Sequence, residues 1–315
     1  MRAKLSIALS ALAAVVWAVP SVGAAHFIAR EHVKEFRQQS ALPLPARFQV
    51  EKARGLLLRA WINGSGPYVF VLDTGAGLNV ISERVVGEAR LTVKSVRPTV
   101  IGGLSAARNS SNREVVINHL ALGDRSNVLP PNKRALVVSF LPPDLDGIID
   151  PTEAYSPFGY SIDMPNQVIE ALDTTAGLVV NRQRTPDGAV VRWLRVGESN
   201  RPFVRLGDGR TALIDTGSGF GLAVNGRHAV IIGSREPRSS DGIRDIAGGT
   251  INSRRVSPTT VSIGELVLRG VPTDILFGVE DDAPVILGRD ALYPFKITFD
   301  PQRRLIAFVT PSDNN

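Results

Sequence analysis

The chain has 315 residues, of which 43% are hydrophobic and 21% charged, as expected for a globular protein with a packed core. Its formal net charge is +6, but the basic residues are scattered and aromatic residues make up only 6%. This pattern argues against nucleic-acid binding, which needs a basic stripe with aromatic side chains for stacking. The absence of cysteine excludes disulfides, thiol nucleophiles and cysteine metal sites.

The N-terminus has the layout of a secretory signal peptide. Two basic residues precede an uncharged stretch from Leu5 to Ala25, which is broken by Pro20. The small residues at 22–24 predict cleavage after position 24. An uncleaved membrane anchor is the alternative, but the uniformly apolar part is short for a spanning helix. We therefore expect residues 1–24 to be a signal peptide and the protein to be exported, periplasmic or secreted.

The segment at 25–46 separates the signal from the first β-rich region. It mixes apolar and charged residues in a pattern that is compatible with a short amphipathic helix. We interpret it as an N-terminal extension, because chain termini are often loosely attached. A removable pro-segment that shields a functional site is the alternative.

An internal repeat organises the rest of the chain. The 29 glycines and 21 prolines, with few long helical patterns, favour an all-β fold of many short strands. Residues 69–77 (VFVLDTGAG) recur as residues 211–219 (TALIDTGSG), 142 positions later. An Asn-Gly pair at 63–64 and an Asp-Gly pair at 208–209 predict a hairpin turn before each copy, because these dipeptides accept positive φ.

The two copies stay in step beyond this motif. A glycine pair follows each one, Gly102-Gly103 in the first copy and Gly248-Gly249 in the second. Each copy then closes with an apolar run and a strand that bears an aspartate. We therefore predict two homologous lobes at 47–173 and 190–311, a linker at 174–189 and a tail at 312–315.

The repeated motif contains Asp-Thr-Gly, at Asp73 and at Asp215. One copy alone is weak evidence, because Asp and Gly are common turn residues, but two copies at matching positions of a repeat indicate a shared site. Two carboxylates held close together share one proton, because like charges at short range do not both ionise. Such a pair can take a proton from water and protonate a carbonyl oxygen, as peptide hydrolysis requires.

The other residues of each triplet have chemical roles of their own. The hydroxyls of Thr74 and Thr216 can brace the two loops through hydrogen bonds. Gly75 and Gly217 let backbone amides approach the carboxylates closely.

The residue after each triplet differs, with alanine at position 76 and Ser218 in the second copy. A serine hydroxyl can hydrogen-bond the adjacent carboxylate and stabilise its charge. We therefore expect Asp215 to ionise more readily than Asp73.

These segments resemble the retropepsin-like branch of the aspartic proteases, in a single-chain form. Residues 69–82 (VFVLDTGAGLNVIS) resemble the family's first active-site segment, and residues 281–308, with ILGRDAL at 286–292, resemble its closing segment. The resemblance implies two β-barrel-like lobes of the pepsin/retropepsin type with the active site in the cleft between them. It also implies that Asp73 and Asp215 are the catalytic pair of an aspartic endopeptidase.

The resemblance further implies that the segments around Gly102-Gly103 and Gly248-Gly249 are flaps that close over a polypeptide substrate in extended conformation. We expect no metal or cofactor, because the four histidines are dispersed and the glycines at 217–221 lack the spacing of a nucleotide-binding loop. A monomer with an internal pseudo-two-fold is expected, because one chain supplies both halves of the site.

One residue departs from the family pattern. Asp150 stands at the position that Gly288 occupies in the second copy. An aspartate there could distort the packing behind Asp73. The alternative function is therefore a catalytically weak or inactive peptide-binding protein that retains the fold.

Overall fold

The computed structural model describes residues 42–174, 188–197, 199–226, 238–239 and 243–311. The expected signal peptide and the tail lie outside these residues, as do most of the N-terminal extension and most of the linker. Leu42–Asn315 is one compact unit. Within the described residues, no helix is long and apolar enough to cross a membrane.

Strands dominate the described chain, which confirms the expected all-β class. In the first half they are β1 (Ala46–Glu51), β2 (Gly55–Ile62), β3 (Ser65–Leu72), β4 (Asn79–Ser82), β5 (Val93–Gly102), β6 (Arg108–Ile117), β7 (Leu120–Leu122), β8 (Lys133–Val138), β9 (Gly147–Ile149), β10 (Gly159–Asp163) and β11 (Val168–Leu172). In the second half they are β12 (Ala189–Arg192), β13 (Leu194–Val196), β14 (Ser199–Arg205), β15 (Thr211–Asp215), β16 (Leu222–Asn225), β17 (Arg238–Ser239), β18 (Ile243–Arg244), β19 (Thr250–Ile263), β20 (Leu266–Phe277), β21 (Val285–Gly288), β22 (Lys296–Asp300) and β23 (Leu305–Val309). The described helices are short: α2 (Glu83–Glu88), α3 (Pro151–Tyr155) and α4 (Arg289–Leu292).

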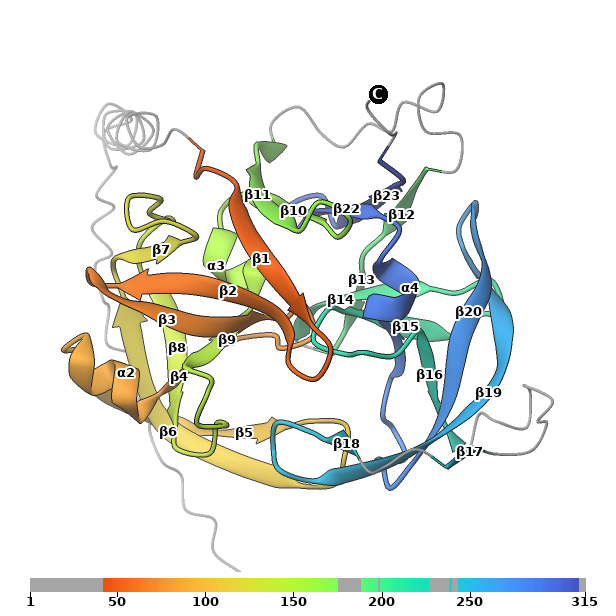
Figure 1. Ribbon diagram of the computed structural model, residues 1–315, viewed down its shortest axis with the longest axis horizontal. Coiled ribbons are helices and arrows are strands. Elements are labelled where there is room, and N and C mark those ends of the chain that lie inside the picture. Colours follow the sequence, from red (N-terminus) through yellow and green to blue (C-terminus); the bar gives the residue numbers. More distant parts are fainter. Residues whose placement is uncertain (1–41, 175–187, 198, 227–237, 240–242, 312–315) are drawn as a thin grey trace, which may run out of the picture. The chain divides into compact units, whose positions relative to one another are not determined.

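These strands form two sheets within the described residues. The larger has the order β12-β23-β22-β10-β11-β1-β2-β3-β9-β4-β8-β6-β5, with β7 paired to β2. The smaller has the order β13-β14-β15-β21-β16-β20-β19-β17, with β18 paired to β19. Figure 1 shows most first-half strands on one side of this unit and most second-half strands on the other.

The strands that lead into the two Asp-Thr-Gly turns have equivalent neighbours. β3 pairs in parallel with β9, and β15 pairs in parallel with β21. β9 and β21 then pair antiparallel with β4 and β16. Both central strands, β9 and β21, are fully buried, which suits their apolar sequences, since strands covered on both faces carry continuous hydrophobic runs. The shared order places Asp73 and Asp215 at corresponding strand ends.

The closing strands of the two halves pair with each other. β10 and β22 are antiparallel, with Tyr160 opposite Phe299 and Ile162 opposite Ile297. The rings of Tyr160 and Phe299 stack with centroids 4.7 Å apart, and Trp193 meets Phe299 edge-on at 6.0 Å. Such aromatic pairs contribute roughly 0.5–1.5 kcal/mol beyond area burial. One aromatic core therefore joins strands from both halves, on the side of the unit where β10, β22 and β23 lie in Figure 1.

Candidate active site

The two Asp-Thr-Gly turns are joined by reciprocal hydrogen bonds between their threonines. The Thr74 hydroxyl donates to the carbonyl of Ile214 at 2.7 Å and accepts the Thr216 amide at 3.1 Å. The Thr216 hydroxyl donates to the carbonyl of Leu72 at 3.1 Å and accepts the Thr74 amide at 3.1 Å. Both threonines are 0% exposed. The structure thus places these side chains where a brace between the turns was expected.

This brace brings the two carboxyl groups face to face. The Gly75 amide donates to Asp73 Oδ1 at 2.7 Å, and the amides of Gly217 and Ser218 donate to Asp215 Oδ1 at 2.9 and 3.1 Å. A Cβ on Gly75 would lie 2.7 Å from Asp215 Cγ, and one on Gly217 would lie 2.5 Å from Asp73 Cγ. Any side chain at either glycine would therefore push the opposite carboxyl away.

Burial changes the protonation of this pair. It raises the pKa of Asp73, although the Gly75 amide opposes the rise. Burial also raises the pKa of Asp215, and the charge of Asp73 adds to the effect, so the pKa of Asp215 lies well above its usual range. The pair therefore keeps one proton at pH values where an isolated carboxyl is ionised, and the two carboxyls share this proton and titrate as a unit.

The expectation that Asp215 ionises more readily than Asp73 lacks its premise in the structure, and the order of ionisation stays a prediction. Its premise was a hydrogen bond from the Ser218 hydroxyl to the carboxylate. Instead, the Ser218 hydroxyl accepts a hydrogen bond from the Phe220 amide at 3.4 Å. The group of Ser218 that donates to Asp215 is its backbone amide.

Arg289, the first residue of α4, holds the second turn from behind. Its Nη1 donates to the carbonyls of Thr216 and Gly217 at 3.2 and 3.0 Å, and its Nη2 donates to the carbonyl of Lys52 at 3.2 Å. The residue is 7% exposed. Burial lowers the pKa of Arg289, but the nearby charge of Asp215 acts in the opposite direction. Sequence analysis did not assign this residue, although it lies within the ILGRDAL segment.

Asp150 is accommodated behind the first turn as the N-cap of α3. Its Oδ1 accepts the Thr152 amide at 3.0 Å, and its own amide donates to Asn79 Oδ1 at 3.0 Å. The Asp73 amide still donates to the carbonyl of Ile149 at 2.9 Å. Asp150 is 1% exposed, and burial raises its pKa to about 8. The structure thus shows a regular helix start at this position and no break in the pairing of β3 with β9.

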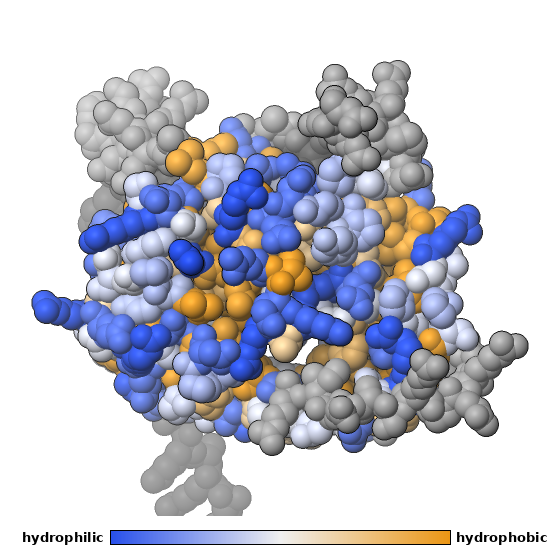
Figure 2. Space-filling model, in the orientation of Figure 1, coloured by the Kyte–Doolittle hydropathy of each residue, from blue (hydrophilic) through white to orange (hydrophobic). Residues whose placement is uncertain are grey.

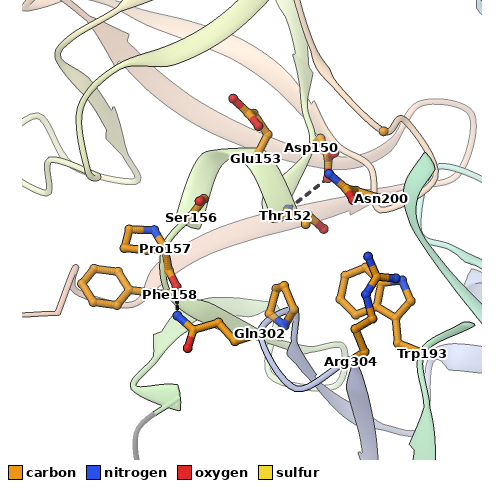
Figure 3. A pocket seen from close by; sticks show the side chains of 12 residues that line it. Asp150, Thr152, Glu153, Ser156, Pro157, Phe158, Trp193, Asn200, Gln302 and Arg304 are labelled. Carbon is orange, nitrogen blue, oxygen red and sulfur yellow. Dashed lines mark hydrogen bonds between the residues drawn. The ribbon is translucent and has the colours of Figure 1, made fainter. Parts of the chain in front are cut away.

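A cavity of about 320 Å³ lies beside Asp150. Figure 3 shows Thr152, Asn200 and Arg304 around it, with Trp193 behind the arginine. In α3, Pro151 stands at the position that Arg289 has in α4. Among the described residues no guanidinium donates to the carbonyls of the first turn as Arg289 does to those of the second. A cavity lined by both polar and apolar residues is present on this side instead.

The carboxyl pair opens into a cleft of about 510 Å³. Asp73 and Asp215 line it together with Gly102 and Gly103, at the end of the β5–β6 hairpin. Figure 2 shows a hollow on this face, bordered by both apolar and hydrophilic residues. The rest of the lining is largely apolar and includes Leu78, Val80, Ile101, Leu104, Leu213 and Ile246.

The second glycine pair lies in the hairpin between β18 and β19, outside the cleft lining. There Asp245 joins the tips of the two hairpins: its Oδ1 accepts the Gly249 amide at 3.0 Å and its Oδ2 accepts the Ser105 amide at 2.8 Å. A Cβ on Gly103 would overlap the Asp245 carboxyl, and one on Gly249 would overlap the Ser105 side chain. Glycine at both positions thus permits the tips to meet, near β5 and β18 in Figure 1.

Gly248 takes a different part in the second hairpin. Its φ of +83° favours glycine, and its amide donates to the carbonyl of Asp245 at 3.0 Å.

In the described part of the chain, no group of three or more His, Asp or Glu residues is arranged to hold a metal ion.

Comparisons with known proteins agree with this geometry. The crystal structure of an aspartic proteinase from Irpex lacteus is similar to this chain, with a TM-score of 0.53, 10% identity, and coverage of 86% of this chain and 98% of that one. The described unit therefore has the aspartic proteinase fold, as the sequence resemblance implied.

The family is indicated by the sequence of the first half. Residues 58–149 match the family model described as aspartyl protease, which confirms the recognised relationship to the retropepsin-like aspartic proteases. The matched segment contains Asp73 but ends before Asp215. A comparison with curated protein sequences found no match.

Proposed function

We propose that the protein is an aspartic endopeptidase in which Asp73 and Asp215 are the catalytic residues. The observation that carries this proposal is the pair of part-buried carboxyls, held by glycine amides and opening into a cleft of about 510 Å³. The relationship to aspartyl proteases supports a peptidase. The predicted signal peptide would place the activity outside the cytoplasm.

In this mechanism a water molecule binds between the two carboxyl groups. Asp73, as carboxylate, takes a proton from water while the water oxygen attacks the peptide carbon. Asp215 gives its proton to the carbonyl oxygen, so the tetrahedral intermediate forms without a free oxyanion. Collapse of the intermediate breaks the C–N bond, and the proton held by Asp73 passes to the departing nitrogen. The intermediate returns the other proton to Asp215, which restores the starting state.

The substrate in this proposal is a polypeptide in extended conformation. The apolar cleft lining would accept side chains on both sides of the scissile bond. The hairpin tips that meet at Asp245 would cover the bound chain and exclude water. One chain supplies both carboxyls, so a monomer suffices for activity.

The test is cleavage of an unfolded protein substrate by the purified protein between about pH 3 and 7. Asp73→Asn and Asp215→Asn should each abolish cleavage, because each removes one of the two proton-transfer groups. Asp124→Asn, at an exposed position, is the matched control and should keep full activity. Unfolding curves must show that all three variants fold. A wild type without cleavage at any pH would favour the peptide-binding alternative.

A further inference from the structure

Arg201 lies in the cleft directly beside the first catalytic turn. It belongs to β14, and both Arg201 and Gly77 line the same cleft as Asp73 and Asp215. A Cβ on Gly77 would lie 3.1 Å from Arg201 Cγ, so the absence of a side chain at Gly77 makes room for the arginine. The φ of Gly77 is +75°, which also favours glycine. Arg201 thus lines the cleft against Gly77, which is four residues after Asp73 in the sequence.

The guanidinium of Arg201 is held in place before any ligand binds. Its Nε donates to the Ser199 hydroxyl at 3.0 Å, and its Cζ lies 5.7 Å from the ring centroid of the buried Phe203. The indole nitrogen of Trp193 fixes the backbone by donating to the Arg201 carbonyl at 2.8 Å. A cation that is already positioned loses little conformational entropy when it binds an anion.

The charge of Arg201 is not compensated by an ion pair within the described residues. The other arginine of the cleft, Arg108, pairs with Glu280. Asp282 also lines the cleft and is exposed. Arg201 therefore differs from Arg108 in having its terminal nitrogens available to a ligand.

We propose that Arg201 determines specificity by binding the side-chain carboxylate of an Asp or Glu residue of the substrate, close to the scissile bond. This proposal rests on the proposed function, since it describes the same cleft. An arginine binds a carboxylate through two parallel hydrogen bonds, which gives both charge and shape selection. The apolar lining would take the neighbouring substrate side chains. The preferred substrate is thus an extended peptide with apolar residues and one acidic residue near the cut.

The test compares pairs of peptides that differ only by Glu or Gln at one position near the cleavage site. At a pH where Glu is ionised, wild type should cleave the Glu peptide with about tenfold higher kcat/KM at one position. Arg201→Gln should remove this preference. Arg201→Glu should instead favour a third peptide, which has Lys at the same position. Arg205→Gln is the matched control, because Arg205 lies exposed on the same strand and donates to the Gly209 carbonyl. It should keep the wild-type preference.

A binding measurement separates this proposal from the proposed function. Fluorescence anisotropy of labelled Glu and Gln peptides on Asp215→Asn protein needs no catalysis, and the Glu peptide should bind about tenfold tighter. Equal binding, or a preference that survives in the Asp215→Asn/Arg201→Gln double variant, would overturn the proposal even if cleavage occurs. Peptides with a free C-terminal carboxylate but no acidic side chain form the third arm. Their preferential binding would also overturn it, because the carboxylate recognised would then be the chain end.

Discussion

Thr74 and Thr216 each accept the other's backbone amide at 3.1 Å, across an interval of 142 residues. Each hydroxyl also donates to the carbonyl at the end of the opposite strand, Leu72 or Ile214. A hydroxyl that both accepts and donates satisfies one amide and one carbonyl of the other turn. This arrangement fixes the carboxyl groups relative to each other through buried groups alone, so it depends on both threonines.

Thr216→Val should therefore destabilise the protein by about 1–3 kcal/mol, because it leaves the Thr74 amide and the Leu72 carbonyl buried without partners. Urea unfolding curves measure the loss. Thr216→Ser keeps the hydroxyl and should cost less. If the valine variant unfolded at the same urea concentration as the serine variant, the hydroxyl would have no bracing role.

Arg289→Met should both destabilise the protein and move its pH profile. The variant leaves the carbonyls of Thr216, Gly217 and Lys52 without this donor. Of these three residues only Thr216 is fully buried, so we expect a loss of roughly 1–3 kcal/mol. Burial raises the pKa of Asp73, and the positive charge of Arg289 opposes this rise. Without that charge the carboxylate is less stable, so the acid limb of kcat/KM should shift to higher pH.

Arg289→Lys is the control for this shift. It retains the positive charge but loses the fork of donors, so it should reproduce much of the stability loss with a smaller change in the acid limb. An unchanged acid limb in the methionine variant would show that Arg289 acts only on stability.

The two aspartates were predictable because their signal is local and repeated. Each lies at the end of an apolar strand, before a threonine and a glycine, and the structure brings these matching strand ends together. The hydrogen bond of the Ser218 hydroxyl was not predictable, since it depends on where this group points. That direction is set by the Phe220 amide, which the triplet itself does not reveal.

Contacts between distant loops could not be predicted from the sequence either. The bond between Asp245 and Ser105 requires two hairpins to approach, and no spacing rule relates these residues. The same holds for β10 and β22, which were assigned to separate lobes but share one sheet. Asp150 looked like a source of distortion because its capping bond to Thr152 appears only once α3 has formed.

Asp150 should make stability depend on pH. Its folded pKa is about 8, whereas an unfolded aspartate titrates near pH 4. Between these values the unfolded state has released a proton that the folded state keeps, so the stability contribution is present at low pH and is lost as pH rises towards 8. Asp150→Asn keeps the cap but cannot ionise. Its unfolding free energy relative to wild type should rise by up to about 1.4 kcal/mol per pH unit across this window.

Urea unfolding of both proteins at pH 5 and pH 8 tests the Asp150 prediction. The comparison of wild type with the variant cancels most of the contribution of the part-buried pair Asp73 and Asp215, which is common to both proteins. A difference in unfolding free energy that is the same at the two pH values would mean that Asp150 is ionised throughout.

Asp245→Ala should loosen the contact between the two hairpin tips. The carboxylate bonds the amides of Ser105 and Gly249 at once, and alanine can replace neither bond. We expect faster hydrogen exchange at these two amides and a several-fold higher KM for peptide substrates, because a cover that opens more often holds the peptide less tightly. The kcat should change less, since the carboxyl pair is untouched.

A matched variant tests whether the Asp245 carboxylate or the contact between the hairpins as a whole holds the two tips together. Asn109→Ala removes the other side-chain bond between the tips, from Asn109 Nδ2 to the Ala247 carbonyl at 3.1 Å, but leaves both bonds of Asp245. If Asp245 is the main link, Asn109→Ala should raise exchange at Ser105 much less than Asp245→Ala does. Equal exchange in the two variants would mean that the tips are held by their whole surface. Unchanged hydrogen exchange in Asp245→Ala would show that the carboxylate does not help to hold the hairpin tips over the cleft.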